Sequence, residues 1–287
     1  MTPTKPRLLS PLVSPQMRET AIDLLMKAAD WAAERLPAPK ASRPIDRAPI
    51  RLVAHRGAWR ERGCIENTFS AFDKAREVGV WGLEFDVRFT KDDIPVVHHD
   101  DSLLRTFGRS IEISSTTFNT LRHEAKEIPT LTEVIAEYGS SFHLFIEIKG
   151  EREDLTEIRL ERLLEPLREH ALQPAQQFHF MAFDFDILKT LNQLKGIPKS
   201  ALVSVVEWNV QAASDRTLEE GYAGFTCHWL AMTDALLQRH HSSHQFCGVG
   251  FLNSKASLRR EWARGVDWGF TNEAVKASQW LDEIAKR

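Results

Sequence analysis

Short apolar runs alternate with longer stretches of helical spacing from residue 51 to near the end of the chain. The apolar runs are too short for helices and predict buried strands. Eight strands are predicted, at residues 51–55, 80–87, 143–148, 177–183, 201–206, 223–229, 246–252 and 266–271. Between them, the spacing predicts helices, among them residues 68–78, 130–138, 154–169, 185–194 and 257–264. Strands alternating with helices favour a parallel sheet, and eight such units predict an α/β fold closed into a (β/α)8 TIM barrel.

A ninth apolar run, residues 94–98, does not fit this parallel pattern. The turn before it, residues 90–93, is far too short for a parallel crossover, which needs a dozen or more residues. The run is therefore predicted to fold back on the second strand as an antiparallel hairpin flap. This flap would rise from the carboxyl end of the barrel, where barrel enzymes keep their active sites.

Residues 1–49 differ in composition from the rest, because eight of the 13 prolines lie before Ile50. They predict a Pro-rich N-terminal extension, followed by one barrel domain over residues 50–287. Inside the extension, Ser14-Pro15 has the form of an N-cap with proline at the first helical position, and Pro37 ends the predicted helix. We expect this helix to pack across one end of the domain. A contact that makes a homo-oligomer and a membrane-surface helix are the alternative interpretations.

The overall composition is that of a globular protein, with 43% hydrophobic and 27% charged residues. The formal net charge of -3 provides no basic field that would favour nucleic acid. The first residues lack the apolar segment and small-residue cleavage site of a signal peptide, and no later run is long enough for a transmembrane segment. A cytoplasmic protein is therefore predicted.

Two carboxylates lie two residues apart in the second predicted strand. Glu84 and Asp86 share one face of this strand, because successive strand side chains alternate. Like charges this close need a cation or basic partners. Glu147 lies near the end of the next predicted strand, so we expect the three carboxylates to converge. Oxygen-only ligation favours one divalent cation, Mg²⁺ or Ca²⁺, over zinc.

Basic residues and histidines surround this acidic group. Arg56 follows His55 at the end of the first predicted strand, Lys149 lies two residues after the third carboxylate, and His98-His99 ends the hairpin. A cation and a basic pair would offset the charge of a phosphoryl group, while one imidazole removes a proton and another donates one. Pairing of Arg56 and Lys149 with the carboxylates is the alternative interpretation. A phosphodiester is favoured over a nucleoside triphosphate, since the chain has no Gly-rich phosphate loop.

The order of the motifs resembles the glycerophosphodiester phosphodiesterase family. The matching segments are His55-Arg56-Gly57, Glu66-Asn67-Thr68, Glu84-Phe85-Asp86, His98-His99-Asp100, Arg105-Thr106 and Glu147-Ile148-Lys149. The resemblance covers about residues 50–275. It implies a (β/α)8 barrel that uses a divalent cation to cleave glycerophosphodiesters to sn-glycerol 3-phosphate and an alcohol.

The resemblance also implies a role for each matching residue. His99, which directly precedes Asp100, matches the motif position better than His98 does. The implied acid–base pair is His55 and His99, the implied metal ligands are Glu84, Asp86 and Glu147, the implied phosphate-binding residues are Arg56 and Lys149, and Glu66 supports them.

The second half of the chain departs from the family pattern. Ala182 stands where the family usually has serine, Gly250-Phe251-Leu252-Asn253 lacks the tryptophan of a Trp-Thr-Val-Asn segment, and Asn272 replaces an aspartate. These changes affect the predicted substrate mouth and leave the predicted catalytic groups intact. Lysophospholipase D activity, a cyclising phospholipase on lipid substrates, and a non-catalytic barrel that binds a phosphate ligand are therefore the alternative functions.

Overall fold

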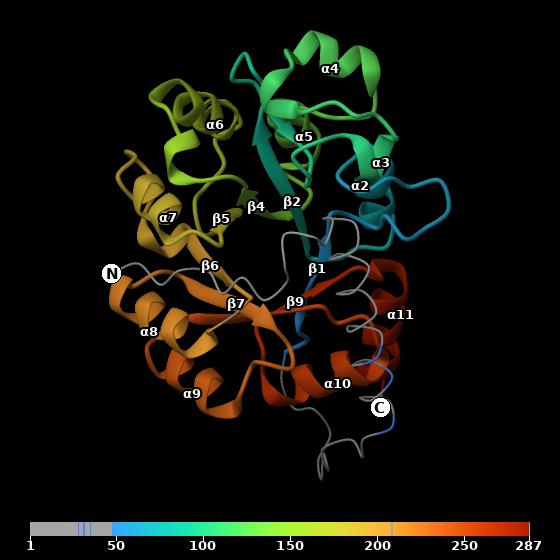
Figure 1. Ribbon diagram of the computed structural model, residues 1–287. Helices are drawn as coiled ribbons and strands as arrows, with labels where there is room; N and C mark the ends of the chain where they lie inside the picture. The colour runs from blue at the N-terminus through green and yellow to red at the C-terminus, as the bar shows by residue number, and fades with distance from the viewer. Residues whose placement is uncertain (1–27, 29–30, 32–34, 36–47, 208, 287) are drawn as a thin grey trace.

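The strands close into a barrel, as the sequence predicts. The computed structural model describes residues 28, 31, 35, 48–207 and 209–286. Its parallel strands are β1 (Arg51–His55), β2 (Gly82–Phe89), β4 (His143–Ile148), β5 (Phe178–Ala182), β6 (Leu202–Val206), β7 (Gly224–His228), β8 (Phe246–Gly250) and β9 (Trp268–Thr271). Each pairs in parallel with the next, and β1 pairs with both β2 and β9, which closes the sheet (Figure 1). The predicted N-terminal helix falls almost entirely outside the described residues.

Helices form an outer ring around the strands (Figure 1). They are α2 (Phe69–Glu77), α5 (Leu131–Tyr138), α6 (Glu157–Glu169), α7 (Phe185–Asn192), α8 (Val210–Glu220), α9 (Asp234–Ser242), α10 (Lys255–Arg264) and α11 (Ala274–Ala285). Two short 3₁₀ turns, η2 (Arg152–Asp154) and η3 (Lys199–Ala201), join elements of the ring. Helix starts follow local capping chemistry: the Thr130 side chain accepts from the Glu133 N–H, and the Glu133 side chain accepts from the Thr130 N–H.

Side chains on the two faces of each strand pack against different partners. On β2, Leu83, Phe85 and Val87 are fully buried in the large core that includes residues of the surrounding helices. The barrel interior has its own apolar layer, formed by Val53, Phe145, Met181, Val203, Ala223, Trp268 and Phe270. This layer fills the middle of the barrel, so the polar residues that follow it along each strand gather at the carboxyl end.

His143 and His179 form a hydrogen-bonded pair below the apolar layer. His143 Nε2 lies 2.7 Å from His179 Nδ1, and His143 Nδ1 lies 3.1 Å from the carbonyl oxygen of Gln176. The Trp81 ring stacks on His143, with ring centroids 4.4 Å apart. Burial lowers the pKa of His143 to about 4 and the pKa of His179 to about 3. Both imidazoles are therefore neutral in the folded barrel at neutral pH.

This pair is expected to make folding stability fall in acid. In the unfolded chain both imidazoles bind a proton near pH 6.5, about the ordinary histidine pKa. Since the folded barrel binds these protons only near pH 4 and below, the stabilisation is complete above about pH 6.5 and is lost as the pH falls toward 4. In urea unfolding, His143→Gln is expected to flatten this dependence by about 1 kcal/mol per pH unit. Equal slopes for variant and wild type would contradict the assignment.

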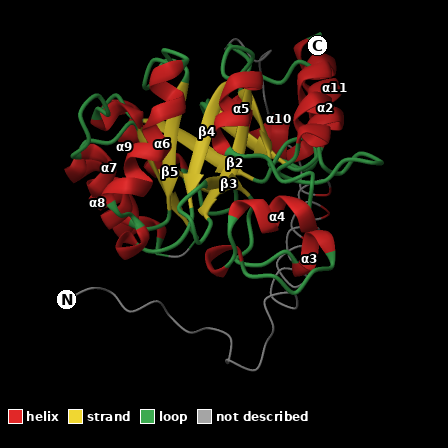
Figure 2. Cartoon of the chain, turned by 90° about the horizontal axis from the view of Figure 1, so that it is seen from above, coloured by secondary structure: helices red, strands yellow, loops and turns green. Residues whose placement is uncertain are grey.

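The predicted hairpin is the start of a larger insertion between β2 and α5. Strand β3 (Pro95–Val97) pairs antiparallel with β2, with Val97 opposite Val87. The chain continues through α3 (Leu104–Phe107), η1 (Ile113–Ser115) and α4 (Phe118–Glu124). These elements enclose a separate small core, formed by Val96, Leu103, Ile113, Leu121, Ala125 and Ile128. Figure 2 shows α3 and α4 at one end of the barrel strands, apart from the outer ring.

None of the helices in the described part of the chain is both long enough and apolar enough to cross a lipid bilayer.

Candidate active site

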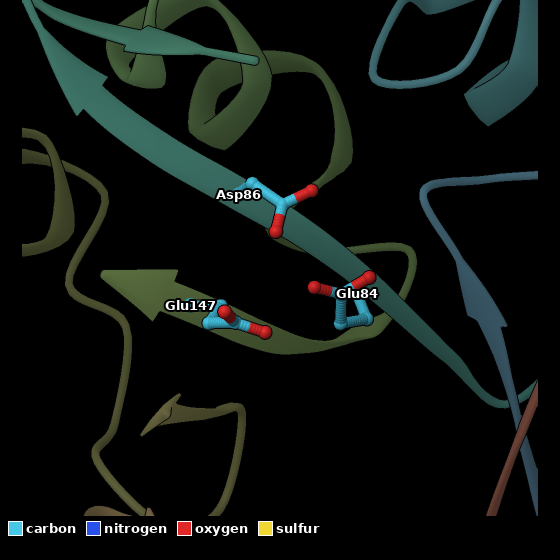
Figure 3. Close-up of side chains that lie close together, drawn as sticks. All are labelled: Glu84, Asp86 and Glu147. Carbon is cyan, nitrogen blue, oxygen red and sulfur yellow. The ribbon is translucent and has the colours of Figure 1, made fainter. Parts of the chain in front are cut away.

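Three carboxylates converge inside the carboxyl end of the barrel, where the sequence predicts them. Glu84 and Asp86 extend from β2, and Glu147 extends from the neighbouring strand β4 (Figure 3). The strand register places Asp86 opposite Glu147. One oxygen from each residue lies within 4.8 Å of the others, and all three residues are buried. Such an oxygen-only group is a suitable site for a hard divalent cation.

The charges of this cluster are incompletely balanced by the protein. Burial and the neighbouring carboxylates raise the pKa of Glu84 well above its usual range. Burial also acts to raise the pKa of Asp86, but the positive charges around it, Lys149 foremost and Arg56 among the others, together outweigh burial and hold this pKa well below its usual range. Among the described residues, no group donates a hydrogen bond to Glu84 Oε1. A buried, unpartnered carboxylate oxygen that favours protonation fits a missing positive charge, so the donor set matches a bound cation.

Lys149 and Arg56 both pair with the carboxylates. Lys149 Nζ lies 2.9 Å from Asp86 Oδ1 and also contacts Glu147 Oε1. Arg56 Nε lies 3.3 Å from Asp86 Oδ2, and Arg56 Nη1 donates to Glu66 Oε1 at 3.1 Å. The two cations therefore lie beside the cluster, where they would also meet an anionic ligand.

The turn after β1 fixes the position of Arg56. Arg56 has a φ of 58°, a conformation that costs about 1 kcal/mol or more for a residue with a Cβ. Its N–H group donates to Glu84 Oε2 at 3.0 Å, which ties the strained turn to the acidic cluster. Gly57 follows with a φ of 79°, and a Cβ at this position would lie 2.8 Å from the main chain of Ala71. Only glycine fits this turn without displacing α2.

His55 lies at the end of β1, opposite Glu84 in the register. Its Nε2 atom is 3.8 Å from Glu84 Oε2, and its Nδ1 atom is 2.7 Å from Asn272 Oδ1. With the Asn272 oxygen accepting, the proton of neutral His55 lies on Nδ1 and Nε2 faces the acidic cluster. Burial and the positive charge of Arg56 lower the pKa of His55 to about 3.

The insertion supplies the second histidine, and it is His99 that faces the site. The Nδ1 atom of His99 lies 2.6 Å from Asp100 Oδ1. Burial and then the charges of Arg56 and Lys149 lower the pKa of His99 to about 4. His98 instead is buried inside the insertion, where its ring stacks on Phe107 at 6.1 Å.

Two asparagines contact residues of the site, although the sequence alone did not indicate a role for either. The Asn67 side chain donates from Nδ2 to Asp86 Oδ2 at 2.8 Å, and this residue belongs to the Glu66-Asn67-Thr68 segment. Asn272 is 217 residues away from His55 along the chain, so their contact follows only from barrel closure. In the sequence, the one sign of a role for Asn272 was its place in the Thr271-Asn272 segment, which departs from the family pattern.

The late strands form an apolar side of the barrel mouth. The Phe251 ring meets His55 edge-on, with centroids 4.7 Å apart, and the Phe183 ring lies 5.6 Å from Lys149 Nζ. Phe183 and Leu230 are both exposed, at 45% and 56%. The three carboxylates lie on β2 and β4, and the basic residues Arg56 and Lys149 directly follow β1 and β4. The apolar side chains instead follow β5, β7 and β8.

Comparisons with known proteins agree with this geometry. The model of the glycerophosphoryl diester phosphodiesterase family matches residues 55–273. Glycerophosphodiester phosphodiesterase 1 of Homo sapiens is 32% identical over 249 residues, which cover 78% of this chain and 71% of that protein. The bovine, mouse and rat proteins of this name match over 36% of their length. Lysophospholipase D GDPD3 of Mus musculus is 39% identical over 95 residues, 33% of this chain and 26% of that protein.

A solved structure extends the likeness to a ligand complex. An Oleispira antarctica phosphodiesterase in complex with the product sn-glycerol-3-phosphate superimposes with a TM-score of 0.68 at 25% identity. The match covers 81% of this chain and 96% of that one.

Proposed function

The chain belongs to the glycerophosphoryl diester phosphodiesterase family, and on this premise we propose that it hydrolyses glycerophosphodiesters to sn-glycerol 3-phosphate and an alcohol. The observation that carries the proposal is the buried group of three carboxylates beside Arg56 and Lys149, with histidines from two separate elements at its edge. This arrangement combines a cation site, positive charge for a phosphate and two proton-transfer groups.

We propose that Glu84, Asp86 and Glu147 hold one divalent cation, Mg²⁺ or Ca²⁺. When bound there, the cation would act as a Lewis acid toward the phosphoryl group. Arg56 and Lys149 then bind the remaining phosphoryl oxygens, exchanging part of their pairing with Asp86 for contact with the substrate. Since the Arg56 and Lys149 side chains lie in a buried, charged environment, they strongly stabilise the negative charge that grows on the phosphoryl group.

His55 and His99 are proposed as the acid–base pair. One imidazole takes the proton from the attacking oxygen, and the other, which must enter the reaction as an imidazolium, gives a proton to the oxygen of the departing alcohol. The negative charge of a bound phosphodiester favours this charged form, which burial disfavours in the ligand-free site. Their partners differ: His55 Nδ1 meets the amide oxygen of Asn272, whereas His99 Nδ1 meets the carboxylate of Asp100. Each partner fixes the orientation of its ring and leaves Nε2 for proton transfer.

Product analysis tests the function directly. Purified protein with Mg²⁺ or Ca²⁺ is expected to release sn-glycerol 3-phosphate from glycerophosphocholine and glycerophosphoethanolamine, as followed by phosphorus NMR. A cyclic glycerophosphate as the final product would instead support the cyclising alternative. Binding of the substrate without turnover under either cation would support a non-catalytic barrel.

A lysophospholipid is the second candidate substrate, because the late strands leave room beside the apolar mouth. Gly248 faces the barrel interior, since a Cβ there would contact Thr226 and Phe270. Gly250, two residues further along β8, therefore faces the mouth, and a Cβ there would have no atom within 4 Å. This open position, next to Phe251 in the sequence, suits the glycerol-linked acyl chain of a lysophospholipase D substrate.

Filling this space is expected to separate the two substrate classes. Gly250→Leu is expected to lower kcat/KM for a lysophosphatidylcholine by about 10-fold or more, because pocket bulk discriminates substrates by 1–3 kcal/mol. The same change is expected to leave turnover of glycerophosphocholine nearly unaltered. Gly250→Ala serves as the size control in the same two assays. Equal losses on both substrates would contradict an acyl site at this position.

The cytoplasmic location, the division into residues 1–49 and 50–287, and a homo-oligomer formed through the N-terminal helix stay predictions. Fractionation of cells and light scattering of the full chain and of a chain beginning at residue 48 test them.

A further inference from the structure

One guanidinium joins the insertion to the barrel. Arg105, in α3, donates from Nε to Asp100 Oδ2 at 2.6 Å and from Nη2 to Asp100 Oδ1 at 3.2 Å. It also donates from Nη1 to Glu66 Oε2 at 2.9 Å and from Nη2 to Glu66 Oε1 at 2.6 Å. All three nitrogens of the group thus donate to carboxylates, in two bidentate pairs.

Each of these carboxylates has a second partner in the active site. Asp100 Oδ1 lies 2.6 Å from His99 Nδ1. Glu66, in the loop after β1, accepts from Arg56 Nη1 at 3.1 Å. A continuous series of charged hydrogen bonds therefore runs from His99 on the insertion to Arg56 on the barrel, and Arg105 is its central member.

The side chains of this network are largely shielded from water, which helps to hold their geometry. The Glu66 side chain is 6% exposed, and those of Arg105 and Asp100 are 24% and 23% exposed. Although burial acts to raise it, Arg105 and Arg56 lower the pKa of Glu66 to about 2, so this carboxylate stays charged. Bidentate arginine–carboxylate pairs fix orientation as well as distance, which a lysine at the same place would do less well.

We propose that Arg105 is a positioning residue, which fixes the His99 imidazole relative to the phosphate-binding Arg56 by bridging Asp100 and Glu66. Without it, two carboxylates would face each other across the junction, and their repulsion would move the insertion and the ring that it carries. In this role Arg105 acts through His99, and all three of its guanidinium nitrogens already donate to Asp100 or Glu66. The inference rests on the role proposed for His99.

Kinetics provide the first test, with Arg105→Ala and Arg105→Lys each made in wild-type and His99→Ala backgrounds. Arg105→Ala is expected to lower kcat by about 10²-fold with little change in KM, since a displacement near 1 Å has this effect. Arg105→Lys and added guanidinium ion are expected to restore part of the loss. Arg109→Ala, an exposed arginine of the same insertion, is the matched control and should behave as wild type. In the His99→Ala background, Arg105→Ala is expected to have no further effect.

A raised KM at unchanged kcat, or a loss that multiplies with that of His99→Ala, would overturn the proposal. NMR provides a second test that needs no turnover and so separates this inference from the proposed function. In protein with nitrogen-15-labelled histidine, the ring signals of His99, identified by their absence in His99→Ala, are expected to shift in Arg105→Ala and Arg105→Lys but not in Arg109→Ala. Unchanged His99 signals in both Arg105 variants would show that the ring is positioned without Arg105, whether or not the enzyme is active.

Discussion

Replacement of His99 or His55 by alanine is expected to lower kcat for glycerophosphodiester hydrolysis by about 10²–10⁴-fold, the usual contribution of a positioned acid or base. The two rings belong to different parts of the fold: His55 ends β1, and His99 lies in the insertion. The loss of either ring leaves one of the two proton transfers without its group. Initial rates at saturating cation and a series of substrate concentrations give kcat and KM for each variant.

The matched control for this pair is His123→Ala, which removes an 84% exposed ring from the same insertion. It should retain wild-type rates. Cation binding and the melting temperature of His55→Ala and His99→Ala should also stay close to those of wild type, because neither ring belongs to the carboxylate cluster. Retention of more than about a tenth of the wild-type kcat in either variant would remove that histidine from the acid–base pair.

Removal of the cation is expected to abolish turnover. Activity should fall by about 10³-fold or more in EDTA and return when Mg²⁺ or Ca²⁺ is added, since a bound cation contributes several kcal/mol to such a reaction. Glu84→Gln and Glu147→Gln should each weaken cation binding, as measured by calorimetry. The cation should also stabilise the fold, by about 2.7 kcal/mol at a concentration 100 times its Kd, because it offsets charges that the protein leaves unbalanced.

Glu127→Gln removes an exposed carboxylate from the insertion and serves as the control for these variants. Its cation affinity and melting temperature should match those of wild type. Full activity after exhaustive chelation, or cation affinity that is the same in Glu84→Gln and wild type, would exclude the carboxylate cluster as the functional metal site.

The barrel itself could be predicted from the sequence because its signals are local. The strand β4 was predicted at residues 143–148 and has these bounds, since its apolar run is flanked by polar turns. The second strand was predicted at residues 80–87, whereas β2 spans Gly82–Phe89. The difference at the carboxyl end has a physical cause: pairing with Pro95 and Val96 of β3 extends the strand to Phe89. The hairpin was predicted, but the apolar pattern does not define how far its two strands pair.

The insertion and the polar support of the site were harder to predict. Helices α3 and α4 have four and seven residues, too few to produce a helical period, and their existence depends on packing around the small core near Leu103. Contacts such as Arg105 with Glu66, 39 residues apart, depend on the tertiary fold. The motif order identified residues of the right chemistry, but partners for Asn272 and Arg105 followed only from the arrangement of the chain in space.

The separate core of the insertion has a consequence for how this active site can be altered. The residues proposed to bind the cation and the phosphate belong to the barrel, whereas His99 belongs to a segment that packs largely on itself. Exchanging residues 98–128 for a segment of different length, while keeping His99, Asp100 and Arg105, would therefore redesign the approach to the barrel and leave Val97 in the main core. In this sense the enzyme is modular: the barrel carries the residues proposed to bind the cation and the phosphate and to make one proton transfer, and the insertion carries the histidine proposed for the other.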